Sequence, residues 1–214
     1  MEFALLFLPL LASITSGFFG KFIGDRNSEI VTSVFVSISA LLSLTLFYQV
    51  IVNGYENNVV IATWINSGTL DVNWSIKVDA LSSVMLVVVT LVSSLVHIYS
   101  IGYMSHDPHK PRFMAYLSLF TFAMLTLVTS DNFLQLFFGW EGVGLCSYFL
   151  IGFWYKKDSA NAAAIKAFVV NRVGDFGFAL GIFLIFYLFG TVNYSEVFQQ
   201  IPQIVDKELL FLGI

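Results

Sequence analysis

One carboxylate, Glu141, lies near the middle of an apolar segment long enough to cross a lipid bilayer. The segment, residues 131–155, reads DNFLQLFFGWEGVGLCSYFLIGFWY. An ionisable side chain at that depth costs about 2.5–3.5 kcal/mol on insertion scales, so charged groups inside a membrane usually serve transport. Such a carboxyl group can gain or lose a proton when its surroundings change, because desolvation and a nearby cation act on its charge in opposite directions. The chemistry that this pattern predicts is ion or proton conduction.

Three more charges, Lys166, Arg172 and Asp175, lie in the next apolar segment. At 1.5 Å per residue they lie about 10, 20 and 24 Å along that helix, which puts Asp175 at a depth comparable to that of Glu141. Arg172 and Asp175 are three residues apart and share a helical face, so an internal ion pair is sterically easy. Lys166 faces a different neighbour, and Glu141 is one candidate.

Each member of this charged group also has a structural interpretation. Arg172 and Asp175 could form a salt bridge that only fixes helix packing, and Lys166 could extend its amine to the headgroups. Glu141 could be a neutral acid bonded to a backbone carbonyl. We take Glu141, Lys166, Arg172 and Asp175 as candidate proton-translocation residues.

The elements that hold these residues are predicted to be membrane helices. The chain is 57% hydrophobic and 11% charged, whereas soluble domains average about 25% charged residues. Strict alternation of polar and apolar residues, which marks barrel strands, is missing. A spanning helix needs about 20 apolar residues. Six segments qualify: 3–19, 30–52, 80–104, 113–130, 132–155 and 160–190. The fold class is therefore an all-α polytopic membrane protein, with Leu209–Ile214 expected to begin a seventh helix in a chain that looks truncated.

The loops predict the orientation of these helices. Six of the eight loop cations lie in the alternate loops 20–29, 105–112 and 156–159, so these loops are expected in the cytoplasm or mitochondrial matrix, with the N-terminus outside. The connection 53–78 contains two runs, 59–65 and 70–76, that can pair as a small hairpin. Asp79 and Asp131 are expected to cap the helices that follow them.

Several other chemistries find no support in the residues. The single cysteine, Cys146, excludes an iron–sulfur cluster. His106 and His109 favour a solvated loop rather than a metal site. His97 is either a core histidine bonded to a neighbour or part of a proton relay. Neither a dinucleotide-binding fingerprint, nor a phosphate-binding loop, nor a basic and aromatic nucleic-acid surface is present, so the chain is expected to hold no redox or catalytic centre, metal or nucleic acid.

The charged segments also resemble a known family. GWEGVGLCSYFLIGFWY (139–155) and AAAIKAFVVNRVGDFGFALG (162–181) look like the L-type antiporter-like membrane subunit of proton-pumping NADH:quinone oxidoreductase, respiratory complex I. Residues 78–104 and 112–141 resemble it too. The likeness covers most of the chain from about residue 70 onward.

The resemblance implies a fold of about fourteen helices in two inverted repeats, with broken helices at the repeat centres. Residues 1–78 would then form an N-terminal helix pair with an external hairpin loop, and 79–214 the start of the proton-translocating domain. Glu141 matches the family's glutamate on the fifth helix, and Lys166, Arg172 and Asp175 match charged positions on the sixth. The lysine-bearing helices of the family would lie beyond Ile214.

The function implied is membrane-embedded proton translocation driven by electron transfer from NADH to quinone in partner subunits, which would hold the FMN and iron–sulfur clusters. The partners implied are the other membrane and peripheral subunits of the complex and the lipid bilayer. A bacterial inner membrane is favoured, with the mitochondrial inner membrane as the alternative. A subunit of a multisubunit sodium/proton antiporter and a purely structural membrane scaffold are the alternative functions.

Overall fold

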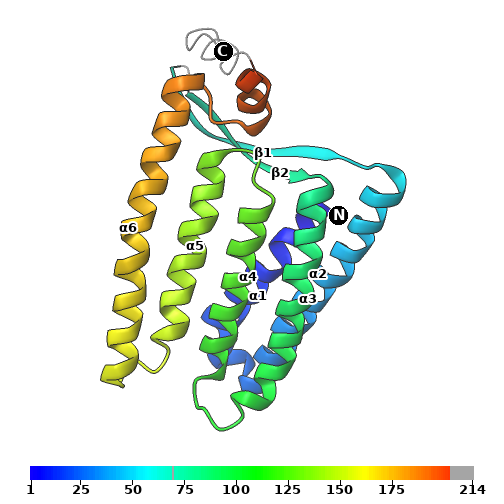
Figure 1. The fold of residues 1–214 in the computed structure, drawn as a ribbon. Helices are drawn as coiled ribbons and strands as arrows, with labels where there is room; N and C mark the ends of the chain where they lie inside the picture. Colours follow the sequence, from blue (N-terminus) through cyan, green and yellow to red (C-terminus); the bar gives the residue numbers. More distant parts are fainter. Residues whose placement is uncertain (69, 203–214) are drawn as a thin grey trace.

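Six long helices run roughly side by side, and a two-stranded sheet lies across one end of them (Figure 1). The computed structural model describes residues 1–68 and 70–202. Each helix is long and apolar enough to cross a membrane, which confirms the predicted all-α polytopic class with six spans. The helices are α1 (Glu2–Ile23), α2 (Asp25–Asn53), α3 (Ala80–Tyr103), α4 (Lys110–Val128), α5 (Phe133–Ile151) and α6 (Asp158–Phe189).

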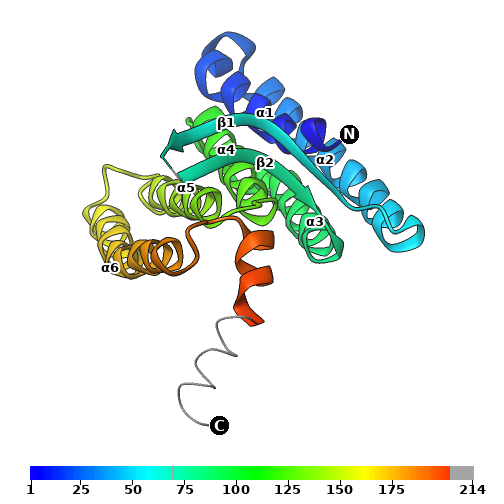
Figure 2. The same ribbon diagram turned by 90° about the horizontal axis from the view of Figure 1, so that it is seen from above.

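The helices α1 to α4 form a bundle, and α5 and α6 continue from α4 as a row (Figure 2). Helix α4 belongs to the bundle and also packs against α5, and α5 lies between α4 and α6. The buried positions of α2 are mostly small or hydroxyl-bearing. Small residues let helices approach closely, which matters in lipid because apolar surface alone gives helices little reason to associate.

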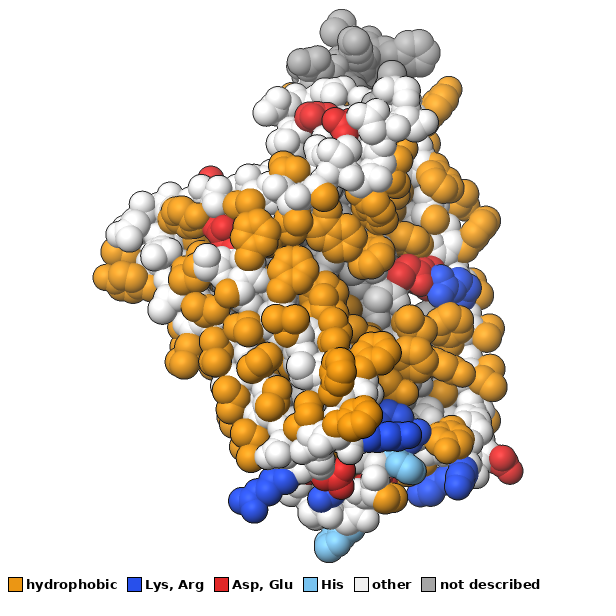
Figure 3. Space-filling model, turned by 180° about the vertical axis from the view of Figure 1, so that it is seen from behind, with side chains coloured by type: hydrophobic (Ala, Val, Ile, Leu, Met, Phe, Trp, Pro, Cys, Tyr) orange, Lys and Arg blue, Asp and Glu red, His pale blue; other side chains and the backbone are white. Residues whose placement is uncertain are grey.

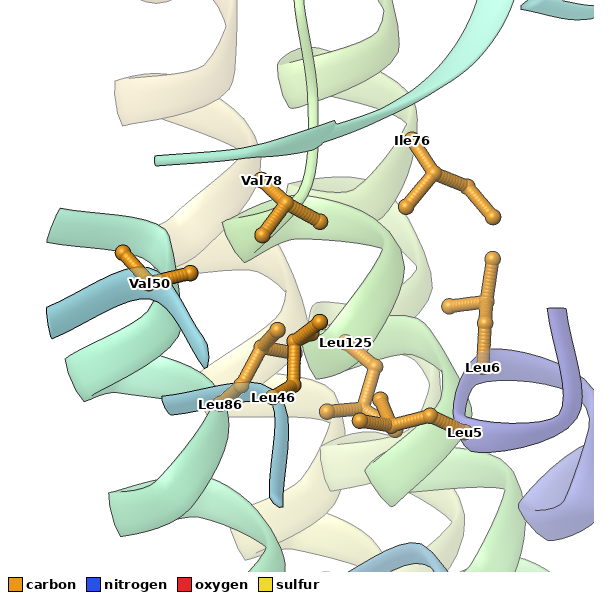
Figure 4. Packing of buried hydrophobic residues seen from close by; sticks show 8 residues of the cluster. All are labelled: Leu5, Leu6, Leu46, Val50, Ile76, Val78, Leu86 and Leu125. Carbon is orange, nitrogen blue, oxygen red and sulfur yellow. The ribbon is translucent and has the colours of Figure 1, made fainter. Parts of the chain in front are cut away.

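The largest apolar cluster lies where α1, α2, α3 and α4 meet beneath the sheet. Its aliphatic side chains interdigitate in the space between these helices, and two of them come from the second strand (Figure 4). The cluster therefore attaches the sheet to the bundle. Its buried members are Leu5, Leu6, Leu46, Val50, Ile76, Val78, Leu86 and Leu125.

The predicted hairpin is present. Strand β1 (Asn57–Ser67) pairs antiparallel with β2 (Leu70–Val78), with Asn57 opposite Val78. The pair crosses the ends of the helices and reaches the end of α5 (Figure 2). There Val72 packs with Ile182 of α6 in a second apolar cluster. The hairpin thus connects the bundle to the row that carries the charged residues.

Two polar side chains at the start of α5 attach this helix to β2. The amide of Gln135, which is fully buried, accepts a hydrogen bond from the Ser75 N–H (3.0 Å) and donates one to the Ser75 carbonyl (2.7 Å). Asn132 donates to the Asn73 carbonyl (2.9 Å). The side chains complete the edge of the strand as a neighbouring strand would.

One of the two predicted helix caps is correct. The Asp79 side chain accepts from the Ser82 N–H, and the Ser82 side chain accepts from the Asp79 N–H, so α3 begins with a capping box. The prediction for Asp131 is wrong, because Asn132 caps α5. Asp131 instead accepts from the Asn58 side chain (2.6 Å) and lies 3.5 Å from the Lys77 amine, contacts that hold the hairpin.

Basic side chains gather at the end of the molecule opposite the hairpin, and the flank between is mainly apolar (Figure 3). This arrangement has the three basic loops at one end, as the loop charges predict. Residues 194–202 form a further short helix after α6. The segment Leu209–Ile214, predicted to begin a seventh helix, lies outside the described residues.

Candidate proton-translocation site

Helix α5 places Glu141 at its centre, as the ninth of 19 residues. At 1.5 Å per residue Glu141 lies about 12 Å along the helix from its first residue and about 15 Å from its last. The Glu141 side chain is 23% exposed within the described chain. The helix is capped by Asn132 at its start and by Gly152 at its end, so it is shorter than the predicted segment 132–155. Glu141 still lies near the middle of the helix.

Helix α6 brings Arg172 against this carboxylate. The Arg172 Nη1 lies 2.6 Å from the Glu141 Oε1, a charge-assisted hydrogen bond between two helices. The same nitrogen is 3.9 Å from the Asp175 Oδ2 within its own helix. Arg172 therefore lies between two carboxylates and is closer to the one on α5. The guanidinium also stacks over the Phe168 ring at 4.8 Å.

A second contact between the same two helices holds Asp175. The Trp140 Nε1–H donates to the Asp175 Oδ1 (2.8 Å), and the Asp175 side chain is only 9% exposed. Consecutive residues of α5, Trp140 and Glu141, thus bind Asp175 and Arg172 of α6. We call these four residues the α5–α6 cluster. Two carboxylates, from α5 and α6, therefore lie within 4 Å of one cation in this cluster.

Lys166 is the one predicted site residue that the structure does not bring to the cluster. It is exposed on α6 and makes no ion pair with any part of residues 1–68 and 70–202. The buried positions of α6 are Ala164, Asp175 and Ile182, which mark the face that packs on α5. Lys166 lies about 200° around the helix from Ala164, so it points away from α5. The partner of Glu141 in the described chain is Arg172.

Glycines on α5 set its distance from α4 rather than from α6. A Cβ at Gly139 would lie 2.7 Å from the backbone of Leu127, and one at Gly142 would lie 3.1 Å from the Ala123 Cβ. A Cβ at Gly144 would meet nothing within 4 Å among the described atoms. Sequence analysis missed the roles of Trp140 and Gly139. The adjacency of an indole donor to Glu141 was a visible signal for the first, whereas only the packing reveals the second.

A separate polar chain runs through the bundle. His97 is fully buried, its Nδ1 lies 2.8 Å from the Ser93 carbonyl, and its Nε2 lies 3.0 Å from the Ser118 hydroxyl. Ser93 bonds Thr121 across α3 and α4 (2.5 Å). Both ring nitrogens therefore have partners. Within the described residues no group of three or more His, Cys, Asp or Glu side chains is arranged to hold a metal ion.

Comparisons with known proteins identify the family of this chain. Residues 64–114 match the family model described as "NADH-Ubiquinone oxidoreductase (complex I), chain 5 N-terminus", and residues 130–214 match "NADH:quinone oxidoreductase/Mrp antiporter, TM". The chain belongs to this family of antiporter-like membrane subunits.

The chain is also similar to curated subunits of NADH:quinone oxidoreductases. The chain is 53% identical to NADH-ubiquinone oxidoreductase chain 5 of Chondrus crispus over its full length, and 58% identical to that of Triticum aestivum over 92% of its length. It is 50% identical to NADH-quinone oxidoreductase subunit L of Rhodobacter capsulatus over its full length. The chain spans about a third of these relatives, namely 32%, 30% and 31% of their lengths.

Solved structures share the fold. The membrane-bound sulfane sulfur reductase, an archaeal respiratory membrane complex, superposes with a TM-score of 0.78 at 19% identity, over 92% of this chain and 39% of that one. The Mrp complex from Dietzia sp. DQ12-45-1b superposes with a TM-score of 0.75 at 23% identity, over 91% of this chain and 20% of that one. At these identities the likeness concerns the fold alone.

Proposed function

We propose that this chain forms part of a membrane subunit of NADH:quinone oxidoreductase and that its α5–α6 cluster takes part in proton translocation. The observation that carries the proposal is the contact between Arg172 and Glu141 at the centre of two adjacent spanning helices. The names of the relatives support the choice of complex, because they are complex I subunits at 50–58% identity.

The cluster acts as a two-position site for one cation. While Glu141 is charged, Arg172 is held against it across the helix interface. When Glu141 takes up a proton, the attraction falls, and the guanidinium can move toward Asp175, which is already 3.9 Å away. Asp175 remains fixed by the Trp140 indole. Proton uptake at Glu141 is thereby coupled to a small movement of one side chain, which changes the field felt by the next charged group along the path.

The rest of the machinery is assigned to partners. Electron transfer from NADH to quinone, with FMN and iron–sulfur clusters, takes place in other membrane and peripheral subunits, and this chain itself holds no redox centre. The subunit lies in an inner membrane, bacterial or mitochondrial, with its basic loops facing the cytoplasm or matrix and its hairpin and N-terminus outside. Lys166, which faces away from α5, contributes by pairing with a residue outside the described chain.

The test is Glu141→Gln in the full-length subunit within its assembled complex. The amide keeps the shape and a hydrogen bond to Arg172 but cannot take up a proton. Proton pumping, measured beside NADH oxidation in sealed vesicles, should fall while assembly is retained. Glu29→Gln is the matched control, since Glu29 is another helix carboxylate close to a cation, Lys110 at 3.8 Å, but it lies at the basic end of α2.

Three outcomes would contradict the proposal. Unchanged pumping in Glu141→Gln would remove this carboxylate from the path. A vesicle flux that needs sodium and no NADH would identify a sodium/proton antiporter instead. Loss of assembly without any change in the ratio of pumping to oxidation would favour a structural scaffold.

A further inference from the structure

A cavity opens beside Arg112 at the basic end of α4, α5 and α6, away from the α5–α6 cluster. It has a volume of about 410 Å³ and is lined mainly by apolar and aromatic residues. A second cavity of about 210 Å³ adjoins it and shares Arg112, Phe153 and Tyr155 with it. The larger cavity runs between helices, whereas the smaller one lies among the loops that carry the basic residues. Together they form one hollow with an apolar inner part and a charged mouth.

The mouth has an excess of positive charge. Arg112, Lys156 and Lys157 line it, against a single carboxylate, Asp107. Both oxygens of Asp107 are occupied by neutral donors, the Trp154 indole (2.9 Å) and the His109 N–H (2.8 Å). Asp107 forms no ion pair with Arg112 within 4 Å in the described chain, so the cations at the mouth keep their capacity to bind an anion.

The charge state of Asp107 supports the same view. Partial burial raises the pKa of Asp107, but the hydrogen bonds from Trp154 and His109, with the nearby charges of His109 and Arg112, outweigh it and hold the pKa below its ordinary value. Asp107 is therefore already ionised at neutral pH. Its negative charge offsets one of the three cations at the mouth and leaves an excess of positive charge.

The guanidinium of Arg112 is held in place by contacts, but one of its N–H donors has no hydrogen-bond partner in the described chain. It donates to the Phe153 carbonyl through Nη2 (3.0 Å) and stacks on the Phe153 and Tyr155 rings at 4.6 and 5.1 Å. Its Nε is buried and has no hydrogen-bond partner within residues 1–68 and 70–202. A buried donor without a partner is costly, so the contacts within the described chain leave the guanidinium incompletely satisfied.

We propose that Arg112, Lys156 and Lys157 bind the phosphate of an anionic phospholipid whose acyl chain lies in the cavity between α4, α5 and α6. The charge at the mouth fits the headgroup, and the apolar wall of Tyr116, Phe149 and Ile165 fits a hydrocarbon chain. Basic pockets between spanning helices on the cytoplasmic or matrix side are suited to anionic headgroups. Trp154 and Tyr155 lie where aromatic residues usually meet the headgroup region.

The test uses Trp154, which lines the mouth, as a reporter. The full-length subunit, with its other tryptophans replaced by phenylalanine, is placed in phosphatidylcholine vesicles that contain a minority of brominated phosphatidylglycerol or brominated phosphatidylcholine. Bromine quenches indole fluorescence only at contact. The anionic lipid should quench Trp154 more strongly, and Arg112→Gln should lower its relative affinity about fivefold, the effect of one cationic side chain near a membrane surface.

Matched variants separate a specific site from general surface charge. Arg26→Gln removes one exposed cation from the first turn of α2 and should leave the preference unchanged, and Arg112→Lys should keep most of it. If Arg112→Gln fails to assemble, the double variant Lys156→Gln/Lys157→Gln should still reduce the preference.

Three results would overturn the proposal. The first is equal quenching by the two brominated lipids in the parent protein. The second is an equal loss of preference in Arg26→Gln and Arg112→Gln, which would mean that only overall surface charge is sensed. The third is relief of quenching by inorganic phosphate, which would mean that the mouth binds a free anion.

Discussion

Arg172 on α6 is closer to Glu141 on the neighbouring helix, at 2.6 Å, than to Asp175 on its own helix, at 3.9 Å. The ion pair that the i, i+3 spacing predicts between Arg172 and Asp175 is present, but it is the longer of the two contacts. Asp175 also accepts from the Trp140 indole, and Arg172 links two spanning helices. The carboxylate of α5 therefore has its counter-charge on a residue of α6.

This relationship predicts a strong coupling between Arg172 and Glu141. Arg172→Gln should destabilise the subunit by about 1–3 kcal/mol, because it leaves a charged carboxylate between helices without its cation. The double variant Arg172→Gln/Glu141→Gln should be less destabilised than Arg172→Gln, since no uncompensated charge remains. Thermal unfolding of the four proteins in detergent measures the cycle.

Lys166→Gln is the control for that cycle. Lys166 is exposed and lies on the other side of α6, so its removal should show no coupling with Glu141→Gln in stability. Additive effects of the Arg172 and Glu141 variants would show that the contact does not exist in the membrane.

Trp140→Phe should loosen Asp175 without emptying the helix interface. Phenylalanine keeps the aromatic packing near Phe178, whose ring lies 6.2 Å from that of Trp140, but cannot donate to Asp175. A hydrogen bond to a charged group contributes about 1.5–3 kcal/mol, so a loss of about that size in stability is expected. Trp154→Phe is the comparison: it also removes an indole donor, but that bond to Asp107 is exposed and should matter less. Equal losses in both variants would contradict the role given to the α5–α6 interface.

Apolar length and turn residues were enough to predict the six helices, the hairpin and the cap at Asp79. These features depend on local chemistry, namely backbone satisfaction in lipid and side-chain bonds to the first turn. The cap of α5 could not be assigned the same way. Asp131 and Asn132 are both good capping residues, and the choice is made by a distant contact, because Lys77 and Asn58 of the hairpin bind Asp131.

Sequence patterns also predicted the charged residues of the candidate site, but they did not predict the pairing of Arg172 with Glu141. Helix periodicity places Arg172 and Asp175 on one face and Lys166 on another, and the structure has them so. It cannot say how α5 is rotated against α6, because that rotation depends on the fit of Gly139 against Leu127 and on the position of Trp140. Sequence spacing therefore left Lys166 as a candidate partner of Glu141, a position that Arg172 takes.

The close approach of α4 and α5 makes two glycines respond in opposite ways to the same substitution. Gly139→Ala would place a methyl group 2.7 Å from backbone atoms of Leu127, which must separate the helices. A loss of about 1–3 kcal/mol is expected from such overpacking. Gly144→Ala meets nothing within 4 Å among the described atoms and should be neutral or stabilise the helix by about 0.5–1 kcal/mol. Thermal unfolding distinguishes them, and equal effects would contradict the packing.

The contact between Gln135 and Ser75 predicts that one side chain holds the hairpin on α5. Gln135→Leu keeps the volume but leaves the Ser75 N–H and carbonyl buried without partners, at a cost of about 1–3 kcal/mol for each unsatisfied group. Amide hydrogen exchange should then speed up in β2 while the centre of α3 stays protected. Gln199→Leu, on an exposed position of the short helix after α6, is the control and should leave β2 unchanged. Unaltered exchange at Ser75 in Gln135→Leu would mean that the other contacts, namely the apolar packing around Val72 and Ile76 and the polar contacts of Asn132 and Asp131, hold the hairpin without Gln135.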